Sequence, residues 1–184
     1  MVGNTSNYNE FDVLRALLKI NANVSRAELC KSLELGEGSI RGILNELKSK
    51  KLITSTKQGH SLSNKGKKAI ENILKNIGLP KKVNLKMYEE FKKVRIIIKN
   101  IKNYMQSYRE RDVAVKNGAE GAIILTNKNG KLDLGFKCNC NLSELEKDSI
   151  INKDDIMIVA WADSYRNAEN SALAAAMSLK KISI

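Results

Sequence analysis

The sequence predicts an α+β fold in two parts, and three observations support this prediction. Apolar residues recur at helical spacing three times before residue 52. Two short β-prone runs then flank a polar turn at 57–60. After Pro80, the only proline of the chain, β-branched runs alternate with two longer helical stretches. We therefore expect one domain over residues 1–78 and a second over residues 79–184.

The first two helices are predicted from periodicity and capping. Residues 10–20 carry an apolar stripe along one helical face. Ser25 is a good N-cap, and Glu28 three residues later completes a capping-box pattern. We therefore expect a second helix over residues 26–33.

A third helix and a hairpin follow. Ser39 is expected to cap an amphipathic helix that ends near Lys51, and the Gly36–Gly38 turn precedes it. Residues 52–56 and 61–63 are short β-prone runs, and another helix opens at residue 64. The order of two helices, a tight turn, a third helix and a hairpin predicts a winged helix-turn-helix.

The segment VSRAELCKSLELGEGSIRGILNELKSKKLITSTKQGHSLSNKGKKAI resembles winged-helix transcriptional regulators. In that family, a phrase like LKSKKLI joins the recognition helix to the first wing strand, and a phrase like LSNKGKKAI closes the wing. RDVAVKNGAEGAIILTNKNGKLDL and the Ala-rich tail resemble the uncharacterised C-terminal α+β domain of some archaeal regulators of this kind. The resemblance implies a DNA-binding fold for about residues 10–78 and supplies no chemistry for the second domain.

The positive charge of the chain is unevenly distributed. The formal net charge is +12, and residues 1–111 hold 23 Lys+Arg against 10 Asp+Glu. Residues 112–184 hold 9 Lys+Arg against 10 Asp+Glu. Such asymmetry favours nucleic acid as a partner. The alternative is a lysine-rich surface that is merely solvated.

The expected DNA contacts follow from the winged-helix interpretation. A recognition helix over 39–51 would read bases through Ser39, Arg41 and Asn45, since Arg pairs with guanine and Asn with adenine. Phosphate or wing contacts are expected from further polar side chains: Lys48, Lys50, Lys51, Lys57, His60, Lys65, Lys67 and Lys68. For any single lysine, a solvated surface charge is the competing interpretation.

The second domain is predicted to have the order β-α-β-β-β-α. The expected strands cover residues 94–98, 122–126, 131–134 and 155–162, and Asn129-Gly130 marks a hairpin turn. Helices are expected over residues 104–116 and 167–180. We expect this domain to form homodimers, to bind a small-molecule effector, or both.

The second domain shows no catalytic motif. The single histidine of the chain lies in the first domain, so a Ser–His or Cys–His nucleophile is not expected here. Candidate ligand or redox residues are Cys138, Cys140, Asp163 and Ser164, with loop thiols and helix caps as the alternatives. Tyr104, Tyr108, Arg109 and Arg111 are candidates for lining a small pocket, whereas Trp161 is expected in the core. We expect no metal, no cofactor and no enzyme activity.

The sequence thus favours a DNA-binding transcriptional regulator whose partners are double-stranded DNA, a second copy of the chain and a small effector. The alternative is a winged-helix module that docks onto transcription or replication machinery without reading DNA sequence. No apolar run reaches the ~20 residues of a membrane helix, and the N-terminus lacks a secretory pattern. We therefore expect a cytoplasmic protein with no membrane partner.

Overall fold

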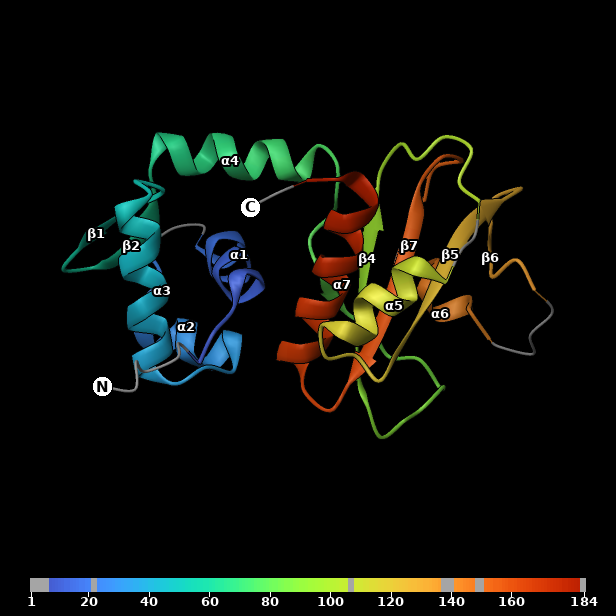
Figure 1. Ribbon diagram of the computed structural model, residues 1–184, viewed down its shortest axis with the longest axis horizontal. Helices are drawn as coiled ribbons and strands as arrows, with labels where there is room; N and C mark the ends of the chain where they lie inside the picture. Colours follow the sequence, from blue (N-terminus) through green and yellow to red (C-terminus); the bar gives the residue numbers. More distant parts are fainter. Residues whose placement is uncertain (1–6, 21–22, 106–107, 137–140, 148–150, 183–184) are drawn as a thin grey trace. The chain divides into compact units, whose positions relative to one another are not determined.

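The computed structural model describes residues 7–20, 23–105, 108–136, 141–147 and 151–182 (Figure 1). Its internal contacts divide the chain into two compact units, Met1–Ile73 and Leu74–Ser183. The division falls at the end of a helix, ahead of the Gly78–Pro80 segment where the sequence suggested a boundary. The α+β class is confirmed, because the described residues form seven helices and two antiparallel sheets.

The first unit is a helical cluster closed by a hairpin. Its helices are α1 (Glu10–Lys19), α2 (Arg26–Leu33), α3 (Glu37–Ser49) and α4 (Asn64–Leu74). Strands β1 (Ile53–Thr56) and β2 (Gly59–Leu62) pair antiparallel between α3 and α4. The core takes buried apolar residues from α1, α2, α3 and β1, and Tyr8, Val24, Leu52, Leu62 and Ile70 pack against it.

Local capping explains where the first helices begin. Ser25 and Glu28 form the predicted capping box of α2, which spans the expected residues. A second capping box, between Asn9 and Asp12, starts α1. The start of α3 was predicted wrongly. Extended Gly36 is its N-cap, so Ser39 lies inside the first turn instead of capping the helix.

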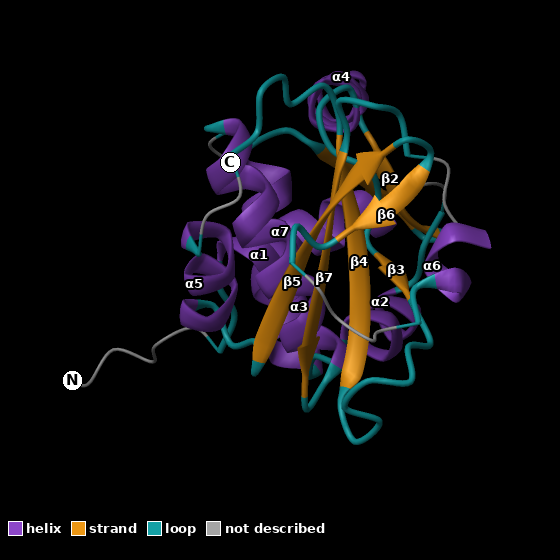
Figure 2. Cartoon of the chain, turned by 90° about the vertical axis from the view of Figure 1, so that its right-hand side faces the viewer, coloured by secondary structure: helices purple, strands orange, loops and turns teal. Residues whose placement is uncertain are grey.

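The second unit is a five-stranded antiparallel sheet with helices on both faces. The strand order is β3-β4-β7-β5-β6. The strands are β3 (Lys81–Lys82), β4 (Lys92–Ile98), β5 (Gly121–Lys128), β6 (Lys131–Asp133) and β7 (Ile156–Ala162). Helices α5 (Arg109–Lys116) and α7 (Tyr165–Lys180) pack on one face, and α6 (Ser143–Lys147) lies on the other side (Figure 2).

The sequence missed two short elements of this unit and misjudged one helix. Strand β3 and helix α6 have two and five residues, too few to show a period. Helix α5 begins at Arg109 instead of Tyr104. Tyr104 precedes the helix, and its hydroxyl donates a hydrogen bond to Glu110 Oε2 at 3.0 Å. The predicted strands around the Asn129-Gly130 turn are confirmed as β5 and β6.

Candidate functional site

Helix α3 has one buried face and one exposed face in the first unit. Ile40, Ile43, Leu44 and Leu47 are buried in the core. Arg41, Asn45 and Lys48 are exposed, and their spacing of four and three residues places them on one stripe of the helix. The stripe therefore presents a guanidinium, a carboxamide and an ammonium group together to a partner.

Ser39 and Gly42 differ from the exposed residues of α3. Ser39 is half-buried in the first turn. Gly42 lies under the ring of Tyr8, since a Cβ at this position would be 2.7 Å from Tyr8 Cε1. Of the three residues that the sequence suggested for base reading, Arg41 and Asn45 are exposed to solvent, and Ser39 is only partly so.

The expected phosphate-binding lysines are exposed, but two of them have partners within the unit. Lys50 Nζ lies 2.9 Å from Glu46 Oε1, one helical turn away. Lys65 Nζ donates to the carbonyl oxygen of Lys50 at 2.9 Å. Lys57 is exposed in the two-residue turn between β1 and β2. The remaining candidates, Lys48, Lys51, Lys67 and Lys68, are also exposed.

His60 was expected among the phosphate or wing contacts, but it is not an exposed residue of the hairpin turn. His60 belongs to β2 and is buried, because its backbone forms an antiparallel bridge with Val24. Its Nδ1 lies 2.7 Å from Ser55 Oγ on the paired strand. Burial lowers the pKa of His60, and the nearby positive charges of Lys48 and Arg26 lower it further. Both the burial of the ring and the lowered pKa disfavour a charged, surface-exposed imidazole at this position.

Arg26 was missed by the sequence reasoning. It is the first residue of α2 and is exposed. Its positive charge lowers the pKa of His60, as that of Lys48 does, so one cation of α2 and one of α3 both lie near this residue of β2. The sequence was enough to place Arg26 in the first turn of α2, directly after the cap Ser25. No local pattern indicated that this turn lies near β2.

The division into units changes the interpretation of the charge asymmetry. Residues 1–73 hold 12 Lys+Arg against 7 Asp+Glu, whereas residues 74–111 hold 11 against 3. The larger excess of positive charge therefore belongs to the second unit.

Several cations of residues 74–111 have contacts within the second unit itself. Lys82 Nζ lies 3.7 Å from the centre of the Tyr165 ring, and Lys99 Nζ donates to the carbonyl oxygen of Leu74 at 2.9 Å.

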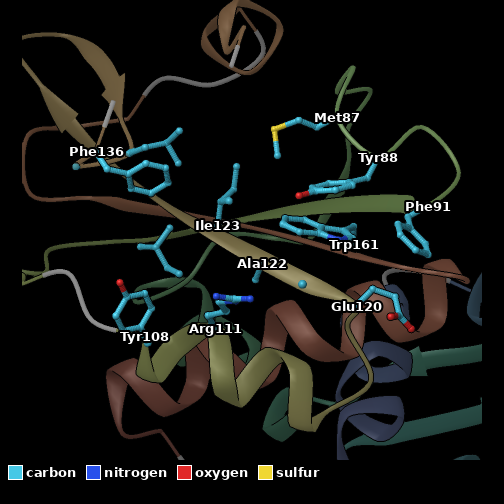
Figure 3. Close-up of a pocket in the computed structure, with 14 residues that line it drawn as sticks. Met87, Tyr88, Phe91, Tyr108, Arg111, Glu120, Ala122, Ile123, Phe136 and Trp161 are labelled. Atoms are coloured by element: carbon cyan, nitrogen blue, oxygen red, sulfur yellow. The ribbon is translucent and has the colours of Figure 1, made fainter. Parts of the chain in front are cut away.

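A hollow of about 850 Å³ lies beside β5 in the second unit (Figure 3). Trp161 was expected in the core, but it is half-buried and lines this hollow, where its ring stacks on Tyr88 at 5.0 Å between centroids. Trp161 occupies the space over Gly121, since a Cβ at Gly121 would overlap the indole ring. Tyr108 and Arg111, two of the expected pocket residues, also line the hollow.

The other candidate residues of the second unit are not brought together. Ser164 is the N-cap of α7, and its Oγ accepts a hydrogen bond from Asn167 N at 3.1 Å. Asp163 is exposed beside it. Cys138 and Cys140 lie outside the described residues. The described residues contain no group of three or more His, Cys, Asp or Glu placed to hold a metal, and no helix among them is long and apolar enough to cross a membrane.

The class of the chain follows from its two units, each of which matches a separate family. Residues 10–68 match the family described as the PH0730-like N-terminal domain, and residues 90–179 match a domain of unknown function, DUF4443. The solved structure of hypothetical protein PH0730 from Pyrococcus horikoshii OT3 is similar over 95% of this chain and 94% of that chain. The TM-score is 0.80 and the sequence identity 30%. The chain therefore belongs to the PH0730-like family.

Part of the chain is also similar to a repressor. The Xylose repressor of Staphylococcus xylosus is 41% identical over 64 residues, which is 35% of this chain. The matched segment spans only 16% of the length of that repressor. The similarity therefore covers a part of that protein the size of a single small domain.

Proposed function

We propose that the protein is a transcriptional regulator whose first unit is a winged helix that binds double-stranded DNA. In this proposal α3 is the recognition helix and lies in the major groove, and the β1–β2 hairpin is the wing. The observation that carries the proposal is the exposed stripe of Arg41, Asn45 and Lys48 on a helix whose opposite face is buried. The partial similarity to a repressor supports it.

The residues of the stripe have separate roles in this proposal. Arg41 pairs with guanine and Asn45 with adenine, because their planar groups match two adjacent atoms on those base edges. Lys48 and Lys57 contact phosphates and hold the helix in place without reading sequence. The second unit dimerises, binds a small effector, or both. The proposal assigns binding and no catalytic reaction to the chain, and it places the protein in the cytoplasm with its DNA.

Binding to DNA tests the proposal through its salt dependence and its sequence preference. We expect the logarithm of the association constant to fall with the logarithm of salt concentration by about 0.9 per phosphate contacted. Arg41→Ala is expected to cost about 1–3 kcal/mol on the preferred sequence and to relax the preference at one base pair. Lys57→Ala should weaken binding to all duplexes about equally.

Lys131→Ala is the matched control, because it removes an exposed cation from the second unit instead. It should leave both the affinity and the sequence preference unchanged. If the native protein did not bind duplex DNA even at low salt, the proposal would fail, and a protein-docking role for the first unit would replace it.

A further inference from the structure

We propose that the outer edge of β5 pairs with the same edge of a second copy of this chain. The two sheets would then join into one continuous antiparallel sheet across a two-fold axis. This inference deepens the proposed function, because it names the surface through which the second unit dimerises.

The first argument is the open edge of β5. On one side, β5 pairs with β7 from Gly121 to Thr126. On the other side, β6 pairs only with Thr126, Asn127 and Lys128. Within the described ranges, Gly121–Leu125 therefore has a strand partner on one side only. Alternate residues of such a strand direct their N–H and C=O groups outward, where they offer a template for another strand.

The second argument is the contrast between β5 and the opposite edge of the sheet. That edge is β3, which consists of two exposed lysines, Lys81 and Lys82. Charged residues and short length are how proteins prevent unwanted edge pairing. The segment Gly121–Leu125, with the sequence GAIIL, has neither a charge nor a proline. The sheet is therefore protected at β3 and left able to pair at β5.

The third argument is the shape of the hollow, which extends around both faces of this edge. Figure 3 shows Tyr108 and Arg111 on the helix side of β5 and Tyr88, Trp161 and Phe136 on the other side. Tyr108 is 79% exposed and Phe136 is 62% exposed, although both are large and apolar. A strand added in line with the sheet would be covered by these rings above and below. A small molecule bound on one face of the sheet would contact only the rings of that face.

The fourth argument concerns charge, and it favours a second copy over an unrelated peptide. Glu120 and Arg111 both line the hollow. Figure 3 shows Glu120 near one end of the open segment and Arg111 farther along it, both on the helix side. A two-fold axis normal to the sheet keeps this side and reverses the strand direction. Glu120 of each copy is thereby brought toward Arg111 of the other, so the surface is complementary to itself.

Charge reversal at these two exposed residues tests the proposal in the full chain. We expect the native protein to be a dimer in sedimentation equilibrium. Arg111→Glu and Glu120→Arg should each weaken self-association about tenfold, because each turns two attractions into two repulsions. An equimolar mixture of the two variants should form dimers again, since both contacts are then between opposite charges. Lys116→Glu, an exposed change on the same helix, should leave self-association unchanged.

Hydrogen exchange provides an independent measurement. Amide exchange in Gly121–Leu125 should slow as protein concentration rises, while exchange in Lys81–Lys82 should not change. A native protein that is monomeric at every concentration would overturn the proposal. So would dimers that both variants leave intact, or a mixture that associates no better than its components.

These outcomes are separate from those of the proposed function. The charge-reversed variants keep the first unit intact, so each should still bind duplex DNA as a monomer. A native protein that dimerises through β5 but binds no DNA would refute the regulatory function and leave the edge pairing in place. A monomer that binds DNA would do the opposite.

Discussion

Gly66→Ala is expected to destabilise the first unit, although the same exchange stabilises most helices. Gly66 lies in the first turn of α4, and an added Cβ would overlap the carbonyl oxygen of Leu52. That oxygen accepts a hydrogen bond from Ser63 N at 2.9 Å, so it is held in place. The new methyl group would have to push the segment between α3 and β1 away from α4. This segment positions the hairpin relative to the proposed recognition helix.

The magnitude follows from two opposing effects. Alanine in place of glycine inside a helix contributes up to about 1 kcal/mol of stability. Overpacking against atoms that cannot rotate away costs about 1–3 kcal/mol. We therefore expect a net loss of about 1–2 kcal/mol in the free energy of unfolding of the first unit. Gly38→Ala in α3 is the matched control, because a Cβ there meets no atom within 4 Å. It should stabilise the unit by about 0.5–1 kcal/mol.

Hydrogen exchange measured by mass spectrometry separates the two units in the full chain. Peptides from α3 report the opening free energy of the first unit, and peptides from β7 report that of the second. Gly66→Ala should speed exchange in α3 and leave β7 unchanged, whereas Gly38→Ala should slow exchange in α3. If amide exchange in α3 were as slow in Gly66→Ala as in the native protein, the close approach of α4 to Leu52 would be refuted.

Two further predictions concern His60 and Gly121. The pKa of His60 lies below the ordinary 6.5 in the folded state, so the imidazole takes up a proton when the first unit unfolds in acid. The free energy of unfolding of this unit should therefore fall as the pH drops through 6.5. Urea unfolding measured between about pH 8 and pH 5 should show this fall in the native protein and a flatter pH profile in His60→Gln. An identical pH profile in the variant would contradict this. Gly121→Ala should displace Trp161 from its stack on Tyr88 and shift the fluorescence emission of this single tryptophan to the red. Gly78→Ala is the control, because the nearest atom to a Cβ at that position is 3.5 Å away, and it should leave the emission unchanged.

Helices and strands were predicted correctly where two local signals in the sequence agreed. The capping pattern at Ser25 and the apolar period after it predicted α2 at its observed bounds. Asn129-Gly130 predicted the β5–β6 turn. The prediction for α3 was wrong at its start because two signals competed. Ser39 is the better cap by residue type, but extended Gly36 lets the helix begin three residues earlier.

Candidate site residues were predicted where exposure follows from helical spacing alone. Arg41 and Asn45 lie opposite the apolar stripe of α3, so the sequence was enough to place them on an exposed face. His60 could not be placed in this way. Its burial comes from pairing with Val24, a residue far away in the sequence. The polar turn beside it suggested an exposed tip instead.

The sequence by itself determined the α+β class, most helices and strands, and the exposed stripe of α3. These depend on periodicity and capping, which act within a few residues. Only the tertiary structure decided that His60 is buried, that Trp161 lines a hollow with Tyr88, and that the edge of β5 is open beside Gly121–Leu125. Each of these depends on which distant segments pack or pair together. Strand order and side-chain burial are properties of those long-range contacts, and no local pattern in the chain encodes them.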